Sequence, residues 1–134
     1  MVTTIGSITL WITRMARSLA FYRKIGIPPR FVSPDRQFAM LDTGGCTLQL
    51  HAGGKPSARL QGAMHIDLTT RDVDRTYRAW KKKGVTFLKP PENMPWGERS
   101  AYLKDPDGYV FEISGPIPRT AKGARPVQAK RNRR

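Results

Sequence analysis

Hydrophobic and polar positions along the chain follow two different periods, and the order of these periods predicts the elements. Residues 5–12 alternate between apolar and polar side chains, a pattern typical of a strand with one buried face. Residues 15–25 place apolar side chains at helical spacing, and Gly26 then ends the predicted helix. Residues 53–62 are rich in small residues and are predicted to be a linker. Further strands are predicted before this linker at residues 30–32, 36–41 and 46–52.

The same succession of patterns returns after the linker. A strand is predicted at residues 63–69, and a helix follows at residues 73–83 and ends at Gly84. Residues 89–97 are rich in proline and are predicted to be a loop. Further strands are predicted at residues 85–88, 99–103 and 109–114. Each half of the chain therefore has the pattern of a βαβββ unit.

The two halves can be aligned residue by residue. An offset of 58 relates the first strand and helix of each half, and an offset of 63 relates the last hairpin. Such self-similarity predicts one supersecondary unit used twice. Because neither unit covers its own apolar face, we expect an α+β fold with a curved eight-stranded mixed sheet, helices on the convex face and a concave cleft. The alignment matches Ser7 with His65, Gln49 with Glu112 and Met40 with Leu103.

Polar positions that face away from the helices mark the candidate site. Glu112 alternates with the apolar Phe111 and Ile113, so it is predicted on the face opposite the core. A carboxylate there is costly unless it is paired, bound to metal or placed at a wet cleft; the alternative is a Glu112 that faces solvent. The same alternation places further side chains on this inner face, namely Trp11, Gln49, His51, His65 and Asp67. A concave surface with these groups has the composition of a binding cleft, although His65 and Asp67 are also compatible with a simple polar pair.

Charge adds a tail to this picture. The 134-residue chain has a formal net charge of +14, and residues 117–134 hold seven Lys or Arg and no acidic residue. That segment has too few large apolar side chains to fold alone, so we predict a domain at residues 1–116, with modules at about 5–52 and 63–115, and a flexible basic tail at 117–134. Such a tail binds nucleic acid through phosphates, or it is only a solubilising extension.

The remaining composition favours a cytoplasmic protein. No apolar run approaches the roughly 20 residues of a membrane span. The first residues lack a basic segment followed by an apolar one, so no secretion signal is predicted. The single Cys46 excludes a disulfide within the chain and suits a reducing compartment.

Several motifs together resemble the vicinal-oxygen-chelate superfamily, which includes glyoxalase I, extradiol dioxygenases and bleomycin-resistance proteins. The resemblance covers about residues 5–115 and implies a small-molecule ligand and commonly a homodimer. Besides the two βαβββ units, it rests on residues 18–26, Met64-His65-Ile66, residues 95–99 and Asp105-Pro106-Asp107-Gly108 followed by Glu112.

In metal-dependent members of this superfamily, the ligands lie on the first and last strands of each unit. Carried over to this chain, the resemblance implies His65 and Glu112 as ligands of a divalent ion (zinc, nickel, manganese or iron), with Gln49 as the third. Ser7 stands where most of these members carry His, so the resemblance implies a degenerate or absent metal site. His51, on the same face as Gln49, is an alternative donor.

Two functions are compatible with the resemblance. Without a metal, the cleft binds a small molecule as the bleomycin-resistance proteins do. With a metal, the protein is a lyase or dioxygenase in which the ion polarises the substrate and Glu112 acts as the catalytic base. Nucleic-acid binding through the tail is a third function, but no base-reading motif occurs in the predicted domain. The predicted ligand-binding residues are Trp11, Phe38, Gln49, His51, Asp67, Trp96 and Arg99.

Overall fold

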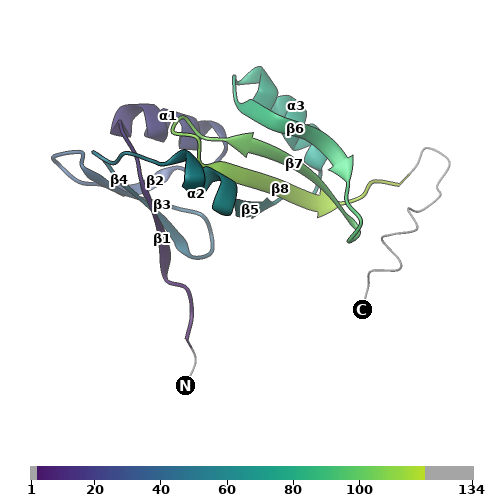
Figure 1. Cartoon of the computed structure of the whole chain (residues 1–134), viewed down its shortest axis with the longest axis horizontal. Coiled ribbons are helices and arrows are strands. Elements are labelled where there is room, and N and C mark those ends of the chain that lie inside the picture. The colour runs from purple at the N-terminus through teal and green to yellow at the C-terminus, as the bar shows by residue number, and fades with distance from the viewer. Residues whose placement is uncertain (1–2, 120–134) are drawn as a thin grey trace. The chain divides into compact units, whose positions relative to one another are not determined.

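The computed structural model describes residues 3–119, which divide into two compact units (Figure 1). Unit 1 covers the described chain up to Leu60 together with the turn Pro106–Gly108. Unit 2 covers Gln61–Asp105 and the described chain from Tyr109 onward. Residues 120–134, which make up most of the predicted basic tail, lie outside the described residues.

Unit 1 is a mixed four-stranded sheet with one helix. The strand order is β1-β4-β3-β2, with β1 parallel to β4 and the other neighbours antiparallel. Alternate strand positions and one stripe of the helix are buried, and Leu19, Tyr22, Leu41 and Leu50 are among the buried side chains. The elements are β1 (Ser7–Trp11), α1 (Met15–Lys24), β2 (Pro29–Val32), β3 (Phe38–Leu41) and β4 (Thr47–His51).

Unit 2 repeats this architecture. Its strand order is β5-β8-β7-β6, with β5 parallel to β8, and α3 contacts β6, β7 and β8. The α3 helix begins where the Asp72 carboxylate accepts a hydrogen bond from the Arg75 N–H at 3.0 Å. The elements are β5 (Ile66–Thr69), α3 (Val73–Lys82), β6 (Thr86–Asn93), β7 (Glu98–Lys104) and β8 (Val110–Pro116).

The predicted α+β fold of two βαβββ units is confirmed. Equivalent backbone hydrogen bonds support the repeat: Ile12 donates to the His51 carbonyl at 2.7 Å, and Thr70 donates to the Ser114 carbonyl at 2.9 Å. These two pairs are related by the same offsets of 58 and 63 that align the halves. Among the described residues the eight strands pair as two four-stranded sheets, without a strand pair that joins them into one.

Two predicted connections contain regular structure. The short helix α2 (Ala58–Ala63) lies at the end of the predicted linker, and β6 continues to Asn93 through most of the predicted proline-rich loop. Pro90 and Pro91 fit in β6 because it is an edge strand and its pairing with β7 shifts register between Lys89 and Glu92. A proline lacks the N–H that a central strand would need, but an edge or a bulge tolerates that loss.

The folded part extends past the predicted boundary at residue 116. Ile117, the first residue assigned to the tail, is buried directly after β8. No helix in residues 3–119 combines the length and apolar character that a membrane crossing requires.

Candidate functional site

Three side chains of unit 2 converge on its open sheet face. The Nε2 atom of His65 lies 2.9 Å from Oδ1 of Asp67 and 3.0 Å from Oε1 of Glu112. The three possible ligand atoms all lie within 4.8 Å of one another. We call this group the His65–Asp67–Glu112 cluster.

Strand pairing explains why these three residues meet. In the parallel pair of β5 and β8, Asp67 lies opposite Glu112. His65 lies two residues before Asp67 and immediately precedes β5, which begins at Ile66 and not at the predicted residue 63. Because side chains two apart in extended chain point the same way, His65 reaches the same face as Asp67. The cluster therefore needs only one short segment and one residue of the neighbouring strand.

The cluster is closed at its base and open at its rim. The Glu112 side chain is 7% exposed, whereas the side chains of His65 and Asp67 are 40% and 62% exposed. The alternative of a solvent-facing Glu112 is therefore wrong. A buried carboxylate requires partners, and the rim leaves His65 and Asp67 within reach of a ligand from solvent.

Tyr102 is a member of this site that the sequence reasoning missed. It lies opposite Glu112 in the pairing of β7 and β8, and its ring meets that of His65 edge-on at 5.5 Å between centroids. Burial, the negative charge of Glu112 and a hydrogen bond to that carboxylate raise the pKa of Tyr102. The phenol therefore stays neutral and acts as a donor to Glu112.

A one-residue difference between the hairpins explains why Tyr102 was missed. Sheet pairing places Met40 opposite Gln49 and Tyr102 opposite Glu112, so Met40 corresponds to Tyr102 and not to Leu103. The second hairpin is longer because Lys104 is inserted before its turn. The sequence signal that could have identified Tyr102 is its position between Ala101 and Leu103. These two residues face the core, so the alternation along β7 places Tyr102 on the other face.

The two carboxylates of the cluster need more hydrogen-bond donors or positive charge than the His65 imidazole alone provides. Partial burial and then the negative charge of Glu112 raise the pKa of Asp67, against the lowering effect of His65. The Nε2 atom carries at most one hydrogen, so it cannot direct a good hydrogen bond at both carboxylates. A divalent cation would satisfy both oxygens and the imidazole together.

The donor set also fits a metal ion by its chemistry and spacing. An imidazole nitrogen and carboxylate oxygens are ordinary ligands of zinc and related divalent ions. Neighbouring ligands about 2.1 Å from one ion lie about 3.0 Å apart in octahedral geometry and about 3.4 Å apart in tetrahedral geometry. The observed separations of 2.9 and 3.0 Å from His65 Nε2 agree with the octahedral spacing.

Three of the predicted ligand-binding residues come together on the open face of unit 1. Trp11, His51 and Phe38 lie in one row across β1, β4 and β3. The Trp11 and His51 rings stack at 4.6 Å, the His51 and Phe38 rings lie 4.9 Å apart, and Trp11 is 54% exposed. In the next row, Gln49 Oε1 accepts a hydrogen bond from Thr9 Oγ1 at 3.3 Å.

The other two predicted ligand-binding residues lie elsewhere in unit 2. Trp96 is exposed in the turn between β6 and β7. Arg99 forms a bidentate ion pair with Asp74 of α3, at 2.9 and 3.1 Å, and its third contact is with Asn93 at 2.9 Å. Arg99 and Tyr102 are three residues apart in β7, so their side chains lie on opposite faces of the sheet. The Arg99 guanidinium is therefore on the face that α3 covers and not at the cluster.

The duplicated βαβββ unit, with two four-stranded mixed sheets and a polar cluster on one sheet face, defines the fold class of this chain. The chain belongs to the Glyoxalase/Bleomycin resistance protein/Dioxygenase superfamily, whose family model matches residues 4–113. The predicted resemblance is thereby confirmed.

Individual relatives agree with this membership. A superfamily member from Sphaerobacter thermophilus DSM 20745 is 30% identical, with a TM-score of 0.64 and coverage of 85% of this chain and 98% of that one. A glyoxalase-related enzyme from Fulvimarina pelagi is 23% identical, with a TM-score of 0.69 and coverage of 92% and 96%. A putative lactoylglutathione lyase of Brassica oleracea var. gemmifera is 37% identical over 60 residues. That match spans 42% of this chain and about a fifth (21%) of the curated relative.

Proposed function

We propose that the protein binds a small molecule with neighbouring oxygen atoms at a divalent ion held by His65 and Glu112. The observation that carries this proposal is the convergence of His65 Nε2 and Glu112 Oε1 at 3.0 Å, beside a second carboxylate. Among the functions of the superfamily, this donor set favours the metal-dependent ones.

Each residue of the site has a distinct task in this proposal. Buried Glu112 supplies a fixed negative charge, and the Tyr102 phenol orients its carboxylate by hydrogen bonding. His65 supplies a neutral nitrogen donor at the half-exposed rim, where a ligand enters. A bound divalent ion supplies Lewis-acid polarisation of the ligand's oxygens. Glu112 as a catalytic base stays a prediction, as do homodimerisation, a cytoplasmic location and nucleic-acid binding by the tail.

Calorimetric titration tests this function. The full chain is stripped with a chelator, dialysed, and titrated with Mn²⁺, Zn²⁺ and Ni²⁺ and, under anaerobic conditions, with Fe²⁺; acetohydroxamate then serves as a probe with two neighbouring oxygens. We expect saturable binding of one ion, weakened at least about tenfold by His65→Ala and by Glu112→Gln. The hydroxamate is expected to bind only to the ion-loaded protein.

The matched control is His51→Ala, which removes the other histidine of the chain from unit 1. Its ion affinity is expected to equal that of the unchanged protein. Absence of saturable ion binding would contradict the proposal. So would His65→Ala and Glu112→Gln variants that bind the ion as tightly as the unchanged protein does.

A second function is supported by the row formed by Trp11, His51 and Phe38. An exposed stacked aromatic row provides a surface for a flat ligand without any metal. Titration of the full chain with a flat aromatic probe in the presence of chelator tests this function: we expect binding that Trp11→Ala abolishes, and equal binding by that variant would contradict it.

A further inference from the structure

We infer that Asp67 is the third protein ligand of this ion, so that unit 2 alone holds a complete three-donor site. The inference rests on the proposed function and deepens it. It assigns to Asp67 the role that the resemblance gives to Gln49 of unit 1. The ion is of a class that takes one nitrogen and two oxygen ligands, such as Mn²⁺, Fe²⁺ or Zn²⁺.

Strand pairing places Asp67 next to Glu112 at the ion site. Asp67 lies directly opposite Glu112 in the parallel pairing of β5 and β8, so their carboxylates are neighbours on one face. His65 Nε2 is 2.9 Å from the Asp67 carboxylate and 3.0 Å from the Glu112 carboxylate. One nitrogen therefore stands next to two acidic oxygens at equal range, as ligands of a common ion do.

Exposure supports an open coordination position. The buried Glu112 forms the base of the cluster, while Asp67 is 62% exposed at its rim. Three protein donors with one open side are typical of metal sites that also bind a ligand or substrate. A carboxylate needed only to pair with His65 would not have to stand beside a second, buried carboxylate.

The repeat shows that these donors are concentrated in one unit. The positions of unit 1 that correspond to His65, Asp67 and Glu112 carry Ser7, Thr9 and Gln49. Thr9 lies opposite Gln49 in the same register, and the two form a neutral hydrogen bond at 3.3 Å. The fold is thus built without charged groups at these positions in one half, and all three ionisable donors occur together in the other half.

Ion titration of the full chain tests the role of Asp67. We expect Asp67→Asn to weaken Mn²⁺ and Zn²⁺ binding at least about tenfold, because an amide is a poorer donor than a carboxylate. The matched control is Asp42→Asn, the same change at an exposed acid in the turn after β3 of unit 1, whose affinity is expected to stay within about twofold. Gln49→Ala is expected to behave like the control.

A stability readout separates ligation from folding. Without ion, the Asp67→Asn variant is expected to unfold at the same or a higher temperature than the unchanged protein, because it removes a carboxylate that lies directly opposite the Glu112 carboxylate. With saturating Mn²⁺ the unchanged protein gains more stability than the variant, since stabilisation follows ion affinity.

The outcomes distinguish the inference from the proposed function. Loss of ion binding in His65→Ala and Glu112→Gln, with Asp67→Asn within about twofold of the unchanged protein, overturns the inference and leaves the proposed function standing. A tenfold loss in Gln49→Ala likewise overturns the self-contained site. An unchanged protein that binds no ion overturns both.

Discussion

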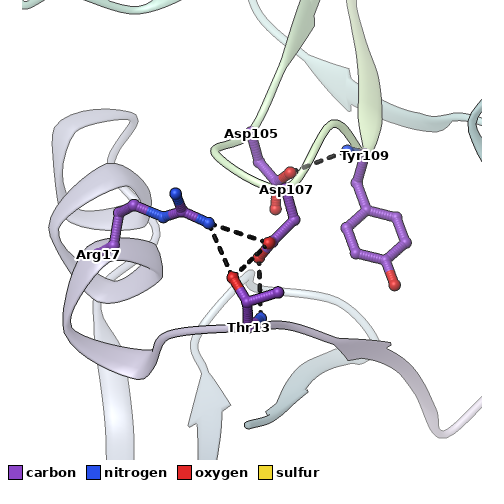
Figure 2. A network of polar contacts seen from close by, with 5 residues as sticks. All are labelled: Thr13, Arg17, Asp105, Asp107 and Tyr109. Atoms are coloured by element: carbon purple, nitrogen blue, oxygen red, sulfur yellow. Dashed lines mark hydrogen bonds and ion pairs between the residues drawn. The ribbon is translucent and has the colours of Figure 1, made fainter. Parts of the chain in front are cut away.

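Replacing Asp107 with alanine tests how the start of α1 is stabilised. Within unit 1, Asp107 Oδ1 accepts hydrogen bonds from Thr13 Oγ1 at 2.7 Å and from Arg17 Nη2 at 3.0 Å (Figure 2). The Thr13 N–H donates to Oδ2 at 3.3 Å, and the Asp107 side chain is only 3% exposed. Arg14, the N-cap residue of α1, makes no side-chain capping hydrogen bond in the described structure. Asp107 therefore supplies the negative charge at this helix start.

The expected loss follows from these contacts. A hydroxyl bond to a buried carboxylate contributes about 1.5 kcal/mol, and the long backbone bond adds little. The ion pair contributes about 0.5 kcal/mol, because the Arg17 side chain is 44% exposed and its charge is well hydrated. Together they predict a loss of about 2 kcal/mol in unfolding free energy and a fall in melting temperature of about 8 °C.

Urea unfolding followed by circular dichroism measures this change. The matched control is Asp35→Ala, since Asp35 also accepts hydrogen bonds, from the Ser33 hydroxyl and the Gln37 N–H, but lies in an exposed turn. Its loss is expected to be much smaller than that of Asp107→Ala. An Asp107→Ala variant with the unfolding midpoint of the unchanged protein would refute the assigned role of this carboxylate.

Two further substitutions test packing and the candidate site. A Cβ atom on Gly115 would lie 2.1 Å from the Thr70 carbonyl oxygen, so Gly115→Ala is expected to cost about 3 kcal/mol in urea unfolding; Gly45→Ala, which meets nothing within 4 Å, should cost almost nothing. Tyr102→Phe removes the phenolic donor from buried Glu112, so a loss of about 1–2 kcal/mol is expected by the same method, and an unchanged midpoint would count against that hydrogen bond.

Strand and helix patterns are predictable where one face is buried. The alternation in β4 and β8 correctly predicts both strands, because every second residue must enter the core. Gly26 and Gly84 mark the helix ends correctly, and both adopt positive φ (80° and 90°), which favours glycine. These are local signals, so they need no knowledge of which strands pair.

The candidate site depends on pairing, which the sequence does not show directly. Spacing alone places His65 and Asp67 on one side of the chain, but their meeting with Glu112 requires the parallel register of β5 and β8. Tyr102 requires the register of β7 as well, and one added residue in the hairpin was enough to hide it. The strand through Pro90 was missed for a related reason, since an edge position is a property of the sheet and not of the segment.

Comparison of the two units separates what the fold requires from what it permits. At equivalent positions, β4 buries Leu48 and Leu50, and β8 buries Phe111 and Ile113, because both cores demand apolar side chains there. Glu112 lies between Phe111 and Ile113 in β8. The equivalent position of β4 is Gln49, a neutral amide on the same face of its sheet. Unit 1 shows that the architecture forms without a charge at this position, and burying one is costly. Folding therefore does not account for the buried carboxylate of unit 2, and the ligation of a cation that we propose would account for it.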